Sequence, residues 1–198
     1  MRRPRLVIML KEPRAGQVKT RLGRDIGMTA AANWFRRHSA RLIRSLQDPR
    51  WEMRLSVTPA PAALNSRVWP ARIPRDAQIR GDLGARMRHI LHTTPAGPVV
   101  LMGGDILGVG RGDIAQAFAV LGHNDYVFGP AEDGGFWLAG ARRGARPLAP
   151  KLFENVRWSC EHSLADTLAT LDGAPCGFVA HRRDVDTLAD LASARPNG

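Results

Sequence analysis

The chain has 198 residues, of which 44% are hydrophobic, so it fits one globular domain and is not a disordered chain. Its net charge of +11 would suit nucleic acid, but only three of its 29 basic residues are lysines, and the arginines are scattered from Arg2 to Arg195. This distribution disfavours a nucleic-acid partner and suits a small anionic ligand such as a nucleotide at least as well.

Cysteine content and the amino-terminal segment bear on the compartment. Two cysteines, Cys160 and Cys176, are too few for a typical secreted disulfide scaffold, and we expect both to be reduced. The apolar run 6–10 behind the basic start is too short for a signal peptide or a membrane span. The expected location is therefore the cytoplasm, without membrane contact.

Hydrophobic periodicity predicts strands and helices along the whole chain. The continuous apolar run Leu6 to Leu10 is typical of a buried central strand. A helix is expected from Thr29, a suitable N-cap, to Leu46, with Asp48-Pro49 ending it. The later expected elements are a strand at 55–58, a loop with an extended piece at 59–76, a helix at 83–91, a strand at 98–102, a helix at 113–121, strands at 126–128 and 136–139, a helix at 163–171, a strand at 178–180 and a helix at 188–194.

This alternation predicts an α/β fold: a single Rossmann-like three-layer domain over residues 1–198, with a mainly parallel sheet and helices on both faces. In open α/β sheets, ligands bind beyond the carboxyl ends of the strands. The unusual polar clusters of this sequence all follow predicted strands or open predicted helices. We therefore expect them to gather at one edge of the sheet.

Four cations lie in the segment 11–22, directly after the first strand. They are Lys11, Arg14, Lys19 and Arg21. Arginine offers phosphate a planar fork and lysine a point charge, while Gly16 allows close approach of a ligand to the backbone. The segment predicts a phosphate-binding loop, with a solvated basic loop as the alternative. It is not a P-loop, because Val18 stands where that motif needs a glycine before its lysine.

Carboxylates follow two further strands. Asp105, behind Gly103-Gly104, suits a hard cation such as Mg²⁺ or Mn²⁺ that bridges phosphate oxygens, although an aspartate in this place can also cap a helix or turn. Asp184 and Asp186 follow the last strand, and Asp186 is the candidate for a second metal ligand. As a lone pair of acids they also fit a helix cap.

A loop and a helix start complete the candidate site. Glu132 and Asp133 precede the pair Gly134-Gly135, which describes either a loop where a ligand nears the backbone or a plain turn. Asp82 opens a helix and is expected either to cap it or to hold a base or ribose.

Together these motifs resemble the DUF2064-type family of small bacterial proteins, within the glycosyltransferase-A-like nucleotide-diphospho-sugar transferase superfamily. The first segment is also similar to the phosphate loop of related nucleotidyltransferases, including the phospholactate guanylyltransferases. The family typically reads G-S-D-C-P where this chain has G-G-D-I-L at 103–107, so Asp105 is kept and the proline turn is lost. The matching segments are K-E-P-R-A-G-Q-V-K-T-R-L (11–22), G-D-L-G-A-R-M (81–87), L-M-G-G-D (101–105), G-P-A-E-D-G-G-F-W-L-A-G (129–140), L-F-E-N-V-R-W-S (152–159) and D-V-D-T-x-x-D-L (184–191).

The resemblance implies a metal on Asp105, with Asp186 as its candidate partner. It places the nucleotide near the helix that begins at Asp82 and the acceptor at the loop Asp133-Gly134-Gly135. The triphosphate contacts that it implies fall on Arg14, Lys19 and Arg21.

The expected activity is a metal-dependent nucleotidyl transfer from an NTP to a small phosphorylated or acidic acceptor, with Lys19 and Arg21 offsetting charge in the transition state. One alternative is a glycosyltransferase that uses an NDP-sugar, with Asp133 or Glu132 as the base. A second is a non-catalytic nucleotide or nucleic-acid binder. The sequence leaves open the base or sugar, the acceptor, and whether the chain forms a homodimer.

Overall fold

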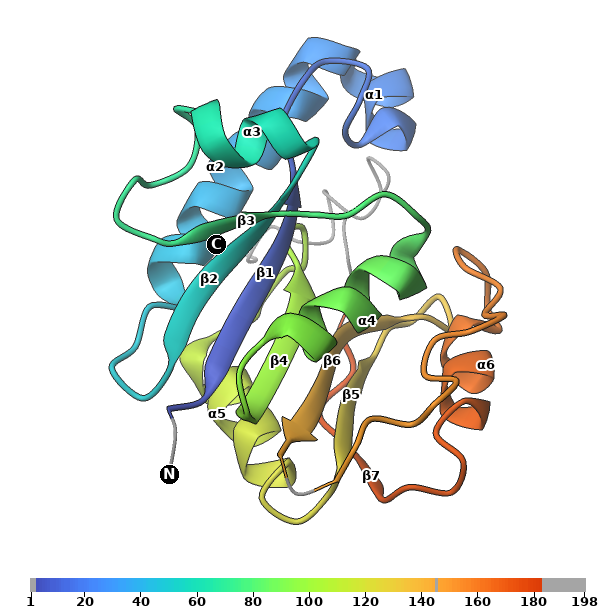
Figure 1. The fold of residues 1–198 in the computed structure, drawn as a ribbon. Coiled ribbons are helices and arrows are strands. Elements are labelled where there is room, and N and C mark those ends of the chain that lie inside the picture. The colour runs from blue at the N-terminus through green and yellow to red at the C-terminus, as the bar shows by residue number, and fades with distance from the viewer. Residues whose placement is uncertain (1–2, 145, 183–198) are drawn as a thin grey trace, which may run out of the picture.

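Strands and helices alternate along most of the chain in the computed structural model, which describes residues 3–144 and 146–182 (Figure 1). In chain order the elements are β1 (Arg5–Lys11), α1 (Thr20–Ile26), α2 (Met28–Ser45), β2 (Glu52–Thr58), α3 (Ala60–Asn65), β3 (Arg75–Ala77), α4 (Leu83–Thr93), β4 (Gly97–Gly103), α5 (Arg111–Val120), β5 (Tyr126–Pro130), β6 (Phe136–Arg143), α6 (Ser163–Ala169) and β7 (Cys176–Phe178).

The strands form one seven-stranded sheet in the order β3-β2-β1-β4-β6-β5-β7. All pairs are parallel except those of β6, which runs antiparallel to β4 and β5. The register sets Lys11 beside Thr58, and Met9 beside Gly103. The carboxyl ends of β1, β2 and β4 therefore meet at one edge, which confirms the predicted mainly parallel α/β sheet.

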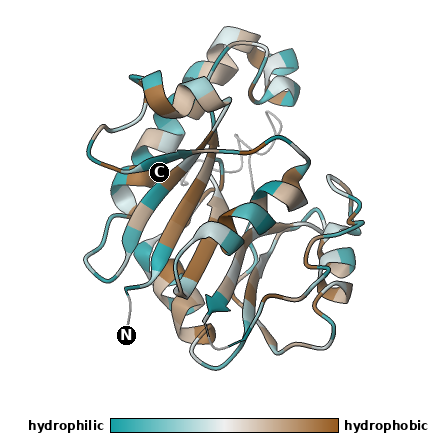
Figure 2. Ribbon diagram, in the orientation of Figure 1, coloured by the Kyte–Doolittle hydropathy of each residue, from teal (hydrophilic) through white to brown (hydrophobic). Residues whose placement is uncertain are grey.

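Both faces of the sheet are covered, which explains why the middle residues of its central strands are apolar (Figure 2). Leu6, Ile8 and Leu10 of β1 belong to a core that includes residues of α2 and α5. Val7, between them in the chain, belongs to the opposite core, with Met87 of α4. This alternation is the one expected of a strand between two helical layers.

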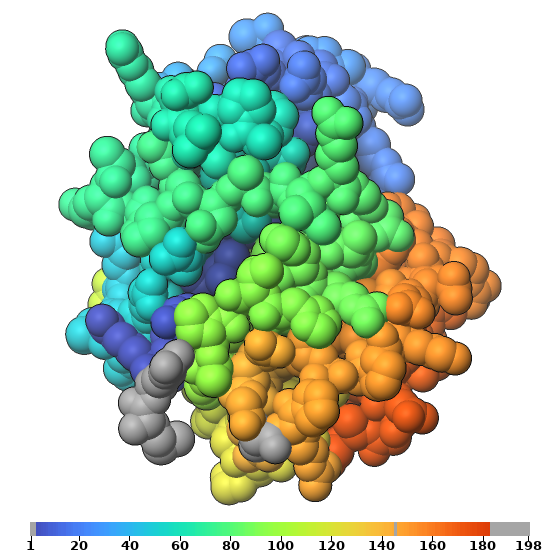
Figure 3. Space-filling view, in the orientation of Figure 1, coloured from blue at the N-terminus to red at the C-terminus, as the bar shows by residue number. Residues whose placement is uncertain are grey.

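Helix α4 and the segment that precedes α6 lie side by side on the second face (Figure 3). Arg88 of α4 donates to the Glu154 carboxylate and to the Pro150 carbonyl. None of the helices in ranges 3–144 and 146–182 has both the length and the hydrophobicity that a bilayer crossing requires.

Three local expectations were wrong. The long helix begins at Met28 with Gly27 as its N-cap, and Thr29 lies inside the first turn. The short helix α1 occupies part of the expected polar loop, and it buries only Leu22 and Gly23. The expected loop at 59–76 contains the helix α3, whereas the extended piece expected within it corresponds to the start of β3. The helix expected at 188–194 lies outside the described residues.

Candidate active site

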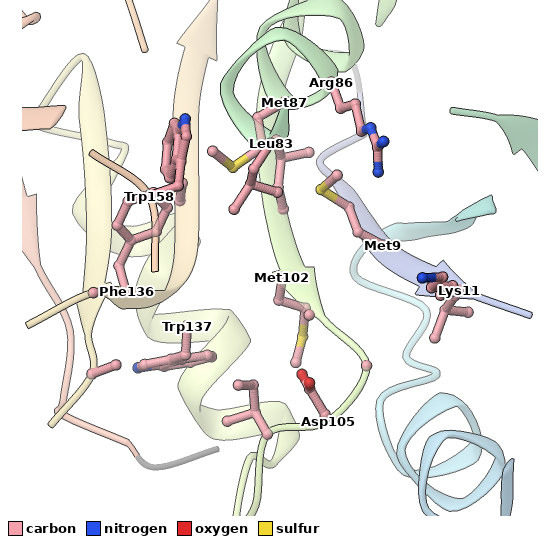
Figure 4. A pocket seen from close by; sticks show the side chains of 18 of the residues that line it. Met9, Lys11, Leu83, Arg86, Met87, Met102, Asp105, Phe136, Trp137 and Trp158 are labelled. Carbon is pink, nitrogen blue, oxygen red and sulfur yellow. The ribbon is translucent and has the colours of Figure 1, made fainter. Parts of the chain in front are cut away.

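A cavity of about 410 Å³ opens where β1 and β4 end, beneath the first turns of α4 (Figure 4). The loop 131–135, the start of β6 and the segment 158–163 contribute its other walls. A second hollow of about 270 Å³ is formed by residues 17–21 together with Lys11, Phe35 and Asp105. These last three residues line both spaces, so the two are adjoining parts of one site.

Lys19 and Asp105 form an ion pair within this site. The Lys19 Nζ lies 2.6 Å from the Asp105 Oδ2, and the two side chains are 7% and 27% exposed. The segment after β1 and the end of β4 are thus in direct contact, as expected from their places on neighbouring strands. The ammonium group shows that a positive charge is accommodated beside this carboxylate, which is the position where the sequence places a metal ion.

The backbone of the basic segment presents Lys19 to Asp105. Val18 is buried in the core beneath α2, which anchors the segment. Lys19 itself has a left-handed backbone (φ 47°, ψ 47°) and is the N-cap of α1. This conformation costs a residue other than glycine roughly 1–2 kcal/mol and is commonest at functional sites. The backbone strain therefore lies at the residue that contacts Asp105.

The turn that carries Asp105 is packed against its neighbours. A Cβ atom at Gly104 would lie 2.2 Å from the Leu10 Cδ2, so the family's usual serine at this position would require Leu10 to move. The His38 Nε2 lies 3.0 Å from the carbonyl oxygen of Ile106, the residue after Asp105. This contact ties the turn to α2.

His38 gives the protein a predicted dependence of stability on pH. Burial lowers its pKa below the ordinary value of 6.5, against the opposing effects of the Ile106 carbonyl and of Asp105. Between the lowered and the ordinary pKa the unfolded chain binds more protons, so the free energy of unfolding falls as the pH falls through 6.5. We measure the free energy of unfolding in urea at pH 7.5 and at pH 5.5. Between these two pH values it should fall less in His38→Gln than in the wild type. Equal losses would contradict this.

The loop after β5 reaches the cavity through Asp133 and Gly135. The Asp133 Oδ1 accepts a hydrogen bond of 2.9 Å from the Gly135 amide, which fixes the carboxylate at the rim. Gly134 has φ 80°, and a Cβ atom there would lie 2.2 Å from the Glu161 carbonyl oxygen. Gly134 is therefore required where two segments touch, and it does not line the cavity.

Replacing Gly134 by alanine is expected to destabilise the fold by about 1–3 kcal/mol, because the left-handed backbone is strained and the Cβ atom meets backbone. The free energy of unfolding in urea measures this. Gly112→Ala in α5 is the matched control, since a Cβ atom there would meet no atom of the described residues beyond its own helix within 4 Å, and a helical alanine stabilises by up to about 1 kcal/mol. Equal stabilities of the two variants would contradict the close approach at Gly134.

The remaining predicted site residues do not all line the two hollows. Asp82 accepts from the Ala85 amide at 2.7 Å, so it caps α4 and does not line the cavity. Arg21 lines the smaller hollow, whereas Arg14 and Gly16 line neither space. Glu132, Arg14 and Gly16 are exposed. Asp184 and Asp186 lie outside the described residues.

Several lining residues were missed by sequence reasoning. Arg86, on the first turns of α4, faces the cavity, and its buried Nε atom has no hydrogen-bond partner among the described residues. Phe136, Trp137 and Trp158 line the opposite side. Arg86 follows the N-cap Asp82 by one helical turn, so the sequence could have indicated that it faces the same edge of the sheet. Trp158 reaches the site only because of the path that the segment before α6 takes, which no sequence pattern indicates.

Metal ligands are sparse in the part of the chain that the structure describes. No group of three or more histidine, cysteine, aspartate or glutamate side chains within it could hold a metal ion. Asp105 offers one carboxylate, so a cation there would need oxygens from a bound phosphate to complete its shell. This arrangement fits Mg²⁺ or Mn²⁺, which are often held by one or two carboxylates and substrate phosphates.

The DUF2064 family, described as an uncharacterized protein conserved in bacteria, matches residues 42–160. No curated protein matches the sequence. A solved structure from Desulfovibrio desulfuricans G20, described as a candidate nucleotide-diphospho-sugar transferase, is 28% identical to this chain. Its TM-score is 0.82, over 96% of this chain and 85% of that chain.

Two more distant solved structures share the fold. Rv0371c from Mycobacterium tuberculosis H37Rv, in complex with manganese, is 17% identical, with a TM-score of 0.57 and 98% of both chains covered. The inositol-1-phosphate CTP transferase from T. maritima is 13% identical, with a TM-score of 0.58 over 95% of this chain and 91% of that chain. The predicted glycosyltransferase-A-like fold is therefore confirmed.

Proposed function

Because the chain belongs to the DUF2064 family, whose fold it shares with nucleotide-diphospho-sugar transferases and nucleotidyltransferases, we propose that it is a metal-dependent, nucleotide-utilising transferase. The observation that carries this proposal is the contact of Lys19 with Asp105 at the junction of the two hollows. Cations and a carboxylate in one space suit a polyphosphate that arrives with a divalent ion.

The favoured reaction is nucleotidyl transfer from an NTP. Lys11, Lys19 and Arg21 line the smaller hollow, and they hold the phosphates there. Their charges offset the negative charge that develops on the α-phosphate and the departing pyrophosphate, and each well-placed cation is worth roughly 2–4 kcal/mol of barrier. A Mg²⁺ or Mn²⁺ ion on Asp105 would supply further positive charge to the phosphate oxygens. The manganese complex of the structural neighbour Rv0371c supports a divalent ion.

Glycosyl transfer from an NDP-sugar is the second candidate. The similarity to the Desulfovibrio protein supports it, and so does the position of Asp133 on the cavity, where a carboxylate could take a proton from an acceptor hydroxyl. Both reactions use the same phosphate contacts, and they differ in the bond that breaks.

The released product separates the two reactions. The protein with Mg²⁺ or Mn²⁺ is incubated with each of the four NTPs or with NDP-sugars, together with a panel of small acceptors. Metal-dependent release of pyrophosphate supports nucleotidyl transfer, and release of a nucleoside diphosphate supports glycosyl transfer. If no nucleotide binds in a metal-dependent way by calorimetry, both are rejected.

A further inference from the structure

The larger cavity has two chemically different ends (Figure 4). Lys11 and Arg86 lie on the side of β1, and they are the only cations among the described residues that line it. Phe136, Trp137 and Trp158 lie on the opposite side. Asp105 lies between the two ends. A nucleotide phosphate and a second substrate therefore meet different surroundings within one space.

The aromatic end is built before any ligand arrives. The ring centroids of Phe136 and Trp158 are 6.2 Å apart, and Phe153 lies 6.4 Å from the first and 6.3 Å from the second. A Cβ atom at Gly84 of α4 would lie 2.8 Å from the Trp158 ring, so the helix packs directly on the indole. Such a fixed apolar surface binds a ring without the cost of ordering side chains.

The charge at the aromatic end is negative. Asp133 lines the cavity and accepts from the amide of Gly135, the residue before Phe136, whereas Asp105, between the two ends, is paired with Lys19. The nearby Arg157 forms its ion pair with Asp166 and does not line the cavity. A phosphate or carboxylate placed against the aromatic rings would lose hydration without gaining a cation from the part of the chain that the structure describes, which is strongly unfavourable. This argues against the phosphorylated or acidic acceptor that the sequence predicts.

At the β1 side of the cavity, the protein offers hydrogen-bonding groups that suit a nucleotide. Gln78 is fixed there by donation from its Nε2 to the carbonyl oxygens of Leu10 (3.3 Å) and Ser56 (2.7 Å). With Lys11 and Arg86 it offers polar contacts for a base or ribose close to the phosphate hollow. The aromatic end is thus left for the second substrate.

We propose that the aromatic end is the acceptor subsite, and that its acceptor is an uncharged ring alcohol, such as a sugar glycoside, rather than a phosphate or carboxylate. This rests on the proposed nucleotidyl transfer. The acceptor hydroxyl oxygen forms the new bond to the α-phosphorus, and its proton passes to the Asp133 carboxylate. Pyrophosphate leaves with the electron pair of the broken P–O bond, giving a phosphodiester of the alcohol.

A matched pair of probes tests the charge of the acceptor. Phenyl β-D-glucoside and phenyl phosphate carry the same ring, and their dissociation constants are measured by calorimetry at fixed ionic strength. We expect the glucoside to bind at least tenfold more tightly than phenyl phosphate. Asp133→Asn should bring the two dissociation constants closer together, because phenyl phosphate binds better once the negative charge is removed. Equal affinities, tighter binding of phenyl phosphate, or no binding of either probe at millimolar concentration would overturn the proposal.

Variants of Trp158 test the location. Trp158→Ala is expected to weaken glucoside binding at least tenfold, and Trp158→Phe, which keeps an aromatic face, less than threefold. Nucleotide affinity should stay within twofold in both. A loss of nucleotide affinity in Trp158→Ala would place the base on these rings and overturn the proposal. If the glucoside binds in a Trp158-dependent way but no nucleotide binds, the transferase function is rejected. The assignment of the aromatic end as a binding subsite is then still supported.

Discussion

Replacing Lys19 by methionine is expected to lower nucleotide-dependent turnover by a factor of about 10²–10³. The ammonium group lies 2.6 Å from the Asp105 carboxylate, where the phosphates of a bound nucleotide would meet the metal ion. Removing one preorganised charge of this kind commonly costs roughly 3–4 kcal/mol of transition-state stabilisation. Methionine keeps the length of the side chain and takes the same left-handed backbone. Initial rates of pyrophosphate or nucleoside diphosphate release measure the effect.

The matched control is Arg24→Met in the last turn of the same helix. Arg24 is exposed and lines neither hollow, and its replacement by methionine removes the same unit of charge as Lys19→Met. Its turnover should remain within about twofold of the wild type. Similar losses in both variants would mean that net charge, and not the position of Lys19, determines the rate. Full turnover in Lys19→Met would reject its assignment to the phosphates.

Asp105→Asn should abolish the metal dependence of nucleotide binding and lower turnover by about 10²–10³. The amide keeps the shape of the side chain and removes the anionic charge on which a divalent cation depends. The Lys19 side chain is only 7% exposed, so the loss of its partner charge should also lower the free energy of unfolding, by roughly 1–3 kcal/mol. Nucleotide titrations with Mg²⁺ or with EDTA, alongside urea denaturation, separate these effects.

Asp76→Asn is a suitable control, because Asp76 forms a surface ion pair with Arg54 and does not line the site. It should leave both metal dependence and turnover unchanged. If Asp105→Asn retains turnover that Mg²⁺ stimulates, the cation is held elsewhere and the role given to Asp105 is wrong.

That Lys19 and Asp105 lie at the same edge of the sheet could be predicted from the sequence, because both follow apolar runs predicted to be strands of one mainly parallel sheet. Their direct contact depends on the pairing of β1 with β4, which the sequence did not predict. The position of Asp133 at the same edge follows from similar reasoning. The helix α1 could not be predicted, since its seven residues bury too little apolar surface to produce a periodic pattern. For Asp82 the sequence left two roles open, and its hydrogen bond to the Ala85 amide corresponds to the cap.

The aromatic end of the cavity was beyond sequence reasoning for a physical reason. Phe153, Asn155 and Ser159 all have positive φ angles, between 57° and 64°, although none is a glycine. Only tertiary packing holds such residues there, and they set the course of the segment that brings Trp158 to α4. A pattern of hydrophobic residues carries no information about such a turn.

A crystal structure of the protein with Mn²⁺ and a nucleoside triphosphate would show where the polyphosphate lies. We predict an anomalous manganese peak within about 2–2.5 Å of an Asp105 carboxylate oxygen, with phosphate oxygens completing the shell and in contact with Lys19. A triphosphate and manganese bound away from Asp105, or a nucleotide in this cavity with Lys19 still closed on Asp105 and no metal between, would contradict the proposed site.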